Sequence, residues 1–158
     1  MTVKLDDLNT GAFVIFINPE NTRSYLWVKH GYGDKKWSLP GGGVKFSEMV
    51  NRAAVREGEE ETGLKILGPL QPIAIASLQK KYGVVILFRV IRFEGIPLVN
   101  GTEITEAKYM TLEEIQEYQV YQAQKRLAEI YEYAIYKLPE KSCLPVYCTL
   151  NDPPIIEI

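Results

Sequence analysis

Residues 42–64 read GGVKFSEMVNRAAVREGEEETGL, and this stretch says more about fold and chemistry than any other part of the chain. It continues a run of three glycines that begins at Gly41, through which no regular element is expected to pass. Beyond the glycines, Ser47 is a suitable helix N-cap, apolar residues recur at helical spacing, and Gly63 stands where a C-terminal glycine ends a helix. The pattern predicts a glycine-rich loop followed by a helix over residues 48–62.

Three glutamates project from one face of this predicted helix. At about 100° per residue, Glu60 lies about 60° to one side of Glu57 and Glu61 about 40° to the other, whereas Glu59 is expected to face solvent on the opposite side. Three like charges side by side repel one another and destabilise a helix. A divalent cation would relieve that repulsion, since Mg²⁺ and Mn²⁺ prefer oxygen ligands.

Taken alone, the acidic run would be interpreted as a solvated helix end. Pairs four residues apart, Arg56 with Glu60 and Arg52 with Glu48, fit that interpretation as well as they fit a metal site. The glycine loop favours the metal site, because backbone N–H groups and a helix N-terminus can approach phosphate oxygens where no side chain intervenes. A glycine loop beside a carboxylate face indicates a metal-bridged phosphate site.

The spacing of these residues resembles the signature of the Nudix hydrolases. Gly42 is followed after five residues by Glu48, and after seven more by the run REGEEETGL that begins at Arg56. Every prescribed position matches except Gly58, where the family usually has an aliphatic residue packed under the helix. Glycine there is expected to cost about 1 kcal/mol of helix propensity relative to alanine, and to lose packing.

The resemblance implies an α/β/α sandwich with a mixed β-sheet between helices, and an enzyme that uses Mg²⁺ or Mn²⁺ to cleave a diphosphate linkage. Its expected substrate is a nucleoside diphosphate linked to another moiety, such as a nucleotide, a dinucleoside polyphosphate or a nucleotide sugar. The roles it implies are metal binding for Glu57, Glu60 and Glu61, orientation of loop and helix for Glu48 and Arg56, and a backbone bend beside the substrate for Gly42 and Gly43. A further ligand or general base is expected from Glu103 or Glu106, with the choice left open.

Substrate selection is less visible in the sequence. Tyr82 lies 18 residues after the signature, as a tyrosine often does in the dinucleoside-polyphosphate hydrolases that the chain resembles. Trp37, Tyr32 and Phe46 flank the loop and are able to stack on a base, although a structural role suits each of them equally. His30 is interpreted as a polar loop residue.

The remaining chain alternates strand and helix patterns. Residues 11–18 and 24–29 are expected to form a hairpin. The predicted helix over residues 119–138 is expected to cover one face of the sheet. The further predicted strands are 72–77, 84–93 and a short one within 106–112, and the last predicted helices are 112–118 and 119–138.

A length of 158 residues predicts one domain, which we place at residues 1–138, with an extended tail at 139–158 docked on the domain or on a partner subunit of a homodimer. A net charge of −2 argues against a large nucleic-acid partner. Without a signal peptide or a membrane-length apolar segment, the protein is expected to be soluble and cytoplasmic, with Cys143 and Cys148 as free thiols.

Two other functions use the same fold. A non-catalytic Nudix-like module would sense a nucleotide, but it has no need of a complete glutamate set. An isoprenoid diphosphate isomerase would require a cysteine and additional histidines around the core, whereas this chain has one histidine, and both cysteines lie in its tail. The sequence therefore favours the hydrolase over the sensing module and the isomerase, and we expect its substrate to be a small diphosphate compound.

Overall fold

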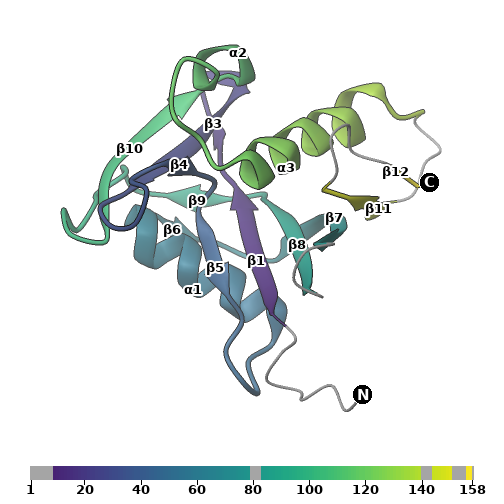
Figure 1. Cartoon of the computed structure of the whole chain (residues 1–158), viewed down its shortest axis with the longest axis horizontal. Coiled ribbons are helices and arrows are strands. Elements are labelled where there is room, and N and C mark those ends of the chain that lie inside the picture. Colours follow the sequence, from purple (N-terminus) through teal and green to yellow (C-terminus); the bar gives the residue numbers. More distant parts are fainter. Residues whose placement is uncertain (1–8, 79–82, 140–143, 151–155, 158) are drawn as a thin grey trace.

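The computed structural model describes residues 9–78, 83–139, 144–150 and 156–157, which fold as a mixed sheet with helices on both sides (Figure 1). Its strands are β1 (Thr10–Ile15), β2 (Ile17–Asn18), β3 (Asn21–His30), β4 (Trp37–Ser38), β5 (Gly41–Gly43), β6 (Lys65–Ile66), β7 (Leu70–Leu78), β8 (Gly83–Val90), β9 (Phe93–Glu94), β10 (Ile104–Met110), β11 (Val146–Thr149) and β12 (Ile156–Glu157). Its helices are α1 (Val50–Thr62), α2 (Leu112–Ile115), α3 (Gln122–Glu132) and the π-helical turn η2 (Tyr133–Lys137).

The main sheet has the strand order β12-β11-β7-β8-β1-β5. Within it, β1 runs parallel to β8 and β7 runs parallel to β11, while the other neighbours are antiparallel. A second sheet has the order β10-β3-β2, with β4 paired to β3, and β6 pairs with β9. The predicted mixed sheet is confirmed.

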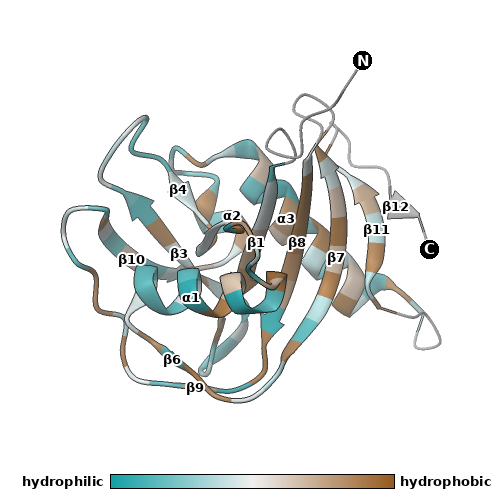
Figure 2. Ribbon diagram, turned by 90° about the horizontal axis from the view of Figure 1, so that it is seen from below, coloured by the Kyte–Doolittle hydropathy of each residue, from teal (hydrophilic) through white to brown (hydrophobic). Residues whose placement is uncertain are grey.

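Two apolar cores lie on opposite faces of the main sheet. Ala12 and Val14 of β1 belong to the core that contains Ala53 and Ala54 of α1. Ile15 of β1 belongs to the other core, which α3 covers. Central strands β8 and β7 are correspondingly rich in apolar residues (Figure 2). This two-sided burial confirms the predicted α/β/α sandwich.

The predicted hairpin of residues 11–18 with 24–29 is right for β2 and wrong for β1. Of the two strands β1 and β2, only β2 pairs with β3, with Ile17 opposite Tyr25. Strand β1 lies between β5 and β8 in the main sheet. The chain changes sheets at Phe16, whose carbonyl accepts a hydrogen bond from Leu26 N–H at 3.0 Å. The sequence gives no sign of this change, because the apolar run continues through it.

Helix α1 begins later than predicted. Its N-cap is Met49, which makes no side-chain capping hydrogen bond, so the expected start at Glu48 with Ser47 as N-cap is wrong. Ser47 has a positive φ of 63° and therefore belongs to the loop. The predicted end is right, because Gly63 adopts a left-handed φ of 70° and its N–H bonds to the Glu59 carbonyl.

Gly58 does not leave the packing defect expected from the sequence. A Cβ at this position would lie 3.1 Å from Val14 Cγ2 and 3.3 Å from Ile66 Cδ1, with Phe16 Cε2 at 3.6 Å. These side chains already fill the space that an aliphatic residue would occupy. Loss of packing at Gly58 is therefore a wrong prediction.

The last two helices are shorter than predicted. Helix α2 ends at Ile115, after a capping box that Thr111 forms with Glu114. Residues 119–121 are not helical, because Gln119 and Tyr121 exchange backbone hydrogen bonds with Trp37, at 2.9 and 3.0 Å. This link fixes the beginning of α3 against β4.

The C-terminal segment adds a strand to the main sheet. Strand β11 pairs in parallel with β7, from Val146 opposite Ala74 to Thr149 opposite Ser77. Cys148 is a buried free thiol, and burial raises its pKa to about 11. Cys143 lies outside the described residues. No helix among the described residues has the length and apolarity needed to cross a membrane.

Candidate active site

The glycines of β5 hold two of the predicted glutamates. Gly41 N–H donates a hydrogen bond of 2.9 Å to Oε2 of Glu61, and a Cβ on Gly42 would lie only 2.7 Å from Cδ of Glu57. Gly41 also has a φ of 149°, and a Cβ there would collide with the Ala12 carbonyl oxygen at 2.4 Å. The glycine run is therefore required so that β1 and two carboxylates can approach the β5 backbone.

Glu61 is almost completely buried, with 5% of its surface exposed. Burial raises the pKa of Glu61 to about 8, against the opposing effect of the Gly41 hydrogen bond, and the negative charges of Glu57, Glu103 and Glu60 raise it further. A protonated carboxyl is the state favoured at neutral pH without a cation. The position is therefore one at which a bound cation would be strongly stabilised.

Arg56 links the glycine loop to the helix. Its Nε and second terminal nitrogen donate to the two oxygens of Glu48 at 2.8 and 2.9 Å, and its other terminal nitrogen contacts Oε1 of Glu57 at 2.5 Å. The guanidinium also donates to the carbonyl of Gly43 at 3.3 Å. The hydrogen bonds from Arg56 lower the pKa of Glu48 to about 2, with a smaller effect from the Lys45 backbone N–H. Both residues hold loop and helix together, as the family resemblance implies for them.

The other two glutamates of α1 differ from each other. Glu60 is 59% exposed and lies 3.4 Å from Arg56. Glu59 was expected to point freely into solvent, and that expectation is wrong: it accepts a hydrogen bond from Ile66 N–H at 2.9 Å and pairs with Lys65 at 3.2 Å. It thereby joins the end of α1 to β6.

The carboxylates fit a divalent metal by their chemistry, although they are not assembled into a ready-made cage. Among the described residues, no group of three or more acidic, histidine or cysteine side chains is close enough together to hold an ion. Glu57 is 16% exposed and carries Arg56 on Oε1, so one of its oxygens is engaged. Glu57 and Glu61 both lie against β5, whereas Glu60 is exposed.

Glu103 and Glu106, the two candidates for a further ligand or general base, have different surroundings in the structure. The negative charge of Glu103 raises the pKa of Glu61, of Tyr32 and of His30. Glu106 instead pairs with Lys29 across strands β10 and β3, at 2.7 Å. Of the two, Glu103 is the residue whose charge acts on Glu61.

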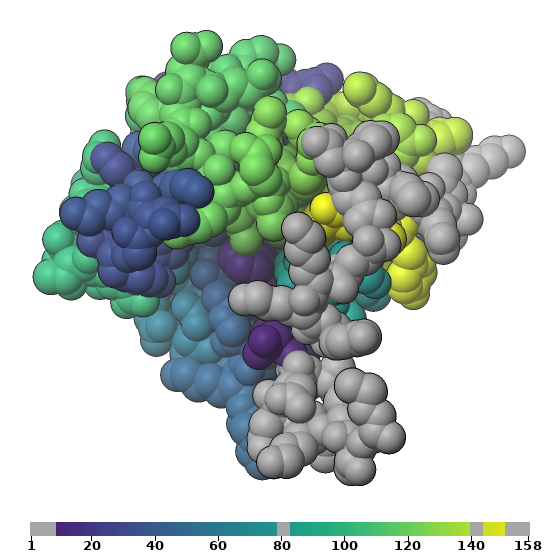
Figure 3. All heavy atoms as spheres, viewed as in Figure 1, coloured from purple at the N-terminus to yellow at the C-terminus, as the bar shows by residue number. Residues whose placement is uncertain are grey.

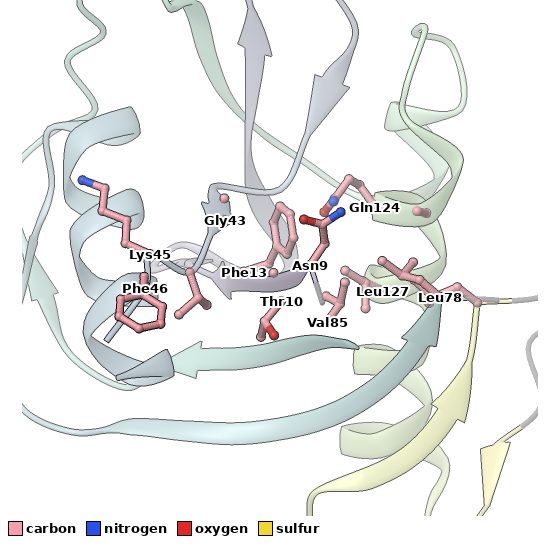
Figure 4. Close-up of a pocket in the computed structure, with 15 residues that line it drawn as sticks. Asn9, Thr10, Phe13, Gly43, Lys45, Phe46, Leu78, Val85, Gln124 and Leu127 are labelled. Carbon is pink, nitrogen blue, oxygen red and sulfur yellow. The ribbon is translucent and has the colours of Figure 1, made fainter. Parts of the chain in front are cut away.

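A cavity of 680 Å³ lies beside the glycine loop, between β1, β8 and α3. Phe13, Gly42 and Gly43 line it, together with Gln124 and Leu127 of α3. In Figure 4, Gln124 extends from α3 toward Phe13 and Asn9, and Figure 3 shows a small area of β1 between the α3 surface and the loop surface. A smaller cavity of 250 Å³ adjoins it and shares Phe13 and Gln124.

The aromatic residues near the loop occupy different positions. Trp37 is only 3% exposed, packs edge-on against Tyr118 and belongs to the core, which favours a structural role over base stacking. Tyr32 and Phe46 are exposed, and they line the smaller and the larger cavity respectively. Tyr82 lies outside the described residues.

His30 lines the smaller cavity, and its place there was not expected from the sequence. Its Nε2 lies 2.8 Å from the Ser38 hydroxyl, and Tyr32 and Tyr121 contact the ring edge-on. Burial lowers the pKa of His30, and the charge of Glu103 opposes this. The ring is neutral at physiological pH under these influences.

Sequence reasoning missed the contribution of α3. Tyr121 and Gln124 at its first turn line the smaller cavity, and Gln124 also lines the larger one. Oε1 of Gln124 is buried without a hydrogen-bond partner among the described residues. The helical pattern located this helix but gave no signal of which side chains would face the loop.

Comparison with known proteins agrees with this geometry. A family model for the NUDIX domain matches residues 8–133. The chain belongs to the Nudix family. Its sequence is 45% identical over 40 residues to an RNA pyrophosphohydrolase of Teredinibacter turnerae, a match that covers 25% of this chain and 23% of that one.

The match to a second relative covers more of the chain. The CMP-5'-(N-acetyl-N-hydroxy-3-aminopropyl)phosphonate hydrolase of Streptomyces rubellomurinus is 32% identical over 114 residues, which span 68% of this chain and 54% of that one. The chain thus spans about a quarter and about half of the lengths of these two curated relatives.

Solved structures share the Nudix fold. A NUDIX hydrolase from Nitrosomonas europaea superimposes with a TM-score of 0.68 at 21% identity, covering 94% of this chain and 82% of that one. An ADP-ribose pyrophosphatase from Streptococcus suis gives 0.64 at 22% identity, covering 88% and 98%. At these identities the likeness establishes the fold.

Proposed function

We propose that this Nudix protein is a metal-dependent hydrolase that cleaves a diphosphate linkage in a nucleoside diphosphate joined to another group. The observation that carries the proposal is the pair Glu57 and Glu61, two nearly buried carboxylates held against the backbone of β5. A cavity large enough for a nucleotide opens on the same strand, lined by Gly42 and Gly43.

Glu57 and Glu61 would hold Mg²⁺ or Mn²⁺, with Glu60 at the exposed side. Such an ion, when bound, stabilises negative charge on phosphate oxygens and lowers the pKa of water. It would also allow Glu61 to lose its proton, because the raised pKa of this residue arises from burial and from neighbouring negative charges.

The protein groups themselves supply position and proton transfer. Arg56 keeps Glu57 and Glu48 in place through its hydrogen bonds to both. We assign proton abstraction from the attacking water to Glu103, because its charge already acts on Glu61 and Tyr32. Water attacks a phosphorus of the diphosphate, the P–O bond to the leaving phosphate breaks, and the proton passes to Glu103.

The larger cavity suits the nucleoside part of the substrate. It combines apolar and aromatic surface from Phe13, Val85 and Leu127 with the amide groups of Asn9 and Gln124. A few polar groups on an apolar wall are typical of sites that orient a ring. The curated relatives are named for an RNA pyrophosphate and a CMP-linked phosphonate, so a nucleotide is the shared part.

A panel of nucleotide substrates assayed with Mg²⁺ or Mn²⁺ tests the proposal. The panel comprises nucleoside triphosphates, dinucleoside polyphosphates, nucleotide sugars and a 5'-triphosphorylated oligoribonucleotide, with release of phosphate, pyrophosphate or nucleoside monophosphate as the readout. We expect metal-dependent turnover of at least one small nucleotide, and its loss in Glu57→Gln. Tight nucleotide binding without turnover of any substrate would instead support the sensing module.

The predicted homodimer, the cytoplasmic location and the lack of a large nucleic-acid partner stay predictions. Sedimentation of the full chain and of a chain that ends at Leu138 tests the dimer. Turnover of the oligoribonucleotide alone would contradict the expectation of a small substrate.

A further inference from the structure

A third cavity lies away from the glutamates. Its volume is 500 Å³, and none of its lining residues contributes to the other two cavities. It forms where β2, the end of β8 and the turn η2 meet, whereas the proposed active site lies by the beginning of β1. The two sites therefore occupy opposite ends of the 10–18 stretch.

Arg89 lines this cavity without a partner. Its Nε is buried and donates to no hydrogen-bond acceptor among the described residues. Arg92 is exposed at the rim, and no side-chain partner is described for it there either. By contrast, Arg23 nearby pairs with Glu132 at 3.3 Å and lies over the Tyr136 ring at 3.6 Å. A buried N–H that lacks an acceptor is destabilising, and an anion on the Nε of Arg89 would remove that penalty.

Arg89 has no acidic neighbour among the described residues that line this cavity. No aspartate or glutamate lines the cavity, and Glu132 is already engaged by Arg23 and by the Tyr25 hydroxyl at 2.7 Å. The hydroxyl of Tyr131 is also buried without a partner, and the positive charge of Arg89 acts on it. The buried Nε of Arg89 is thus an unsatisfied donor at a cavity whose only charged lining residues are Arg89 and Arg92.

The remaining wall is apolar. Ile17, Phe93 and Ile135 line it, with the ring of Tyr136 at η2. The volume falls within the range of sites that enclose small organic molecules. A bare inorganic ion would leave this apolar surface uncovered.

We propose that this cavity binds a small organic anion, a phosphate or carboxylate group on an apolar or aromatic body, through Arg89 and Arg92. The guanidinium of Arg89 meets the anionic group, and the apolar wall between β2 and η2 contacts the body. No acidic side chain takes part, so binding requires no divalent metal. The site is thereby distinct in position and chemistry from the proposed active site.

Calorimetric titration in EDTA with phenyl phosphate and with benzoate tests the site, with benzyl alcohol as the uncharged probe. We expect wild type and Glu57→Gln to bind at least one of the two anions equally, and benzyl alcohol much more weakly. Arg89→Met should weaken anion binding by about tenfold or more, and Arg92→Gln by less. Arg52→Met, which removes an exposed arginine of α1, is the matched control and should bind as wild type does.

Thermal melting separates this role from a structural one. Removing an unpaired buried charge should leave the anion-free melting temperature of Arg89→Met unchanged or higher, while phenyl phosphate no longer raises it. A lower anion-free melting temperature would show that Arg89 has structural partners and would overturn the proposal. So would failure of wild type to bind either anion, equal weakening in Arg52→Met, or loss of binding in Glu57→Gln.

Discussion

The carboxylate of Glu57 occupies the space that a side chain at Gly42 would need. A Cβ on Gly42 would lie 2.7 Å from Cδ and 2.9 Å from both carboxylate oxygens, whereas a Cβ on Gly43 would have no atom within 4 Å. Two adjacent glycines therefore differ in what they do. The first gives room to a candidate metal ligand, and the second leaves the cavity wall open.

Gly42→Ala should displace Glu57, and we expect turnover to fall roughly a hundredfold, since a shift of about 1 Å in a catalytic group has that effect. Stabilisation by Mg²⁺ or Mn²⁺, measured as the rise in melting temperature, should fall with it. Gly43→Ala is the control for this second measurement and should keep the full metal-dependent rise. Equal behaviour of the two variants in melting would contradict the assigned role of Gly42.

Glu57→Gln and Glu61→Gln should each reduce turnover by at least about a hundredfold while the fold stays intact. The amide keeps the shape but loses the charge that binds metal. In Glu61→Gln the metal-free melting temperature should rise. Folding at neutral pH requires Glu61 to take up a proton, because its pKa is raised to about 8, and the amide removes that cost.

Glu59→Gln is the control for these variants, because the amide oxygen can still accept the hydrogen bond from Ile66 N–H. It should retain activity and metal-dependent melting. Equally mild effects in all three variants would indicate a solvated acidic run, and equal losses in all three would contradict the roles assigned to Glu57 and Glu61.

Glu103→Gln should lower turnover by about a hundredfold or more if it accepts the proton, since general bases contribute that much. Glu106→Gln removes a carboxylate that pairs with Lys29 on the sheet surface and should have little effect. Comparison of kcat for the two variants, with circular dichroism to verify folding, decides between them. Greater loss in Glu106→Gln would reverse the assignment.

Acid should weaken the contact between Glu48 and Arg56. The folded pKa of Glu48 is lowered from 4.5 to about 2, so its contribution to stability is present above pH 4.5 and is lost as the pH falls toward 2. Urea midpoints of wild type and Glu48→Gln, measured without metal, should differ most above pH 5 and converge toward pH 3. A constant difference over that range would mean that the charge of Glu48 is not what stabilises the loop.

Gly58 should tolerate alanine but not leucine. In Gly58→Ala, a gain of about 1 kcal/mol in helix propensity opposes contacts at 3.1 and 3.3 Å, so the net change is expected to be small. Gly58→Leu should destabilise the fold by about 1–3 kcal/mol in urea unfolding, because Val14 and Ile66 fill the space. Adding Val14→Ala should recover part of this loss. Full tolerance of leucine alone would show that the sheet yields at this point.

Local rules predicted the parts of the fold that depend on local interactions. The end of α1 follows from Gly63, and the common face of Glu57 and Glu61 follows from helical spacing. The start of α1 was wrong because Glu48 bonds to Arg56 instead of opening the helix, and no propensity encodes that contact. The apolar face with Ala53 and Ala54 is the same whether α1 starts at Glu48, as predicted, or at Val50, as observed.

Long-range placement was the part that could not be predicted. The sequence offered Glu103 and Glu106 as equals, and only the pairing of β10 with β3 directs Glu106 to Lys29. The approach of Gln124 to the glycine loop likewise depends on the backbone contacts that Trp37 makes with residues 119–121. Neither contact produces a periodic pattern in the amino-acid sequence from which it could be predicted.

The parallel pairing of β11 with β7 has a consequence for solubility. A strand at the rim of a sheet offers unpaired N–H and C=O groups to any other extended chain, and such rims nucleate aggregation. Residues Val146–Thr149 pair with β7 from Ala74 to Ser77 and cover its rim, where the Ser77 carbonyl accepts a hydrogen bond from Leu150 N–H. The C-terminal segment therefore protects the edge of the sheet against pairing with other chains. Removing it would expose an aggregation-prone edge strand, while the glutamates and their glycine loop stayed in place.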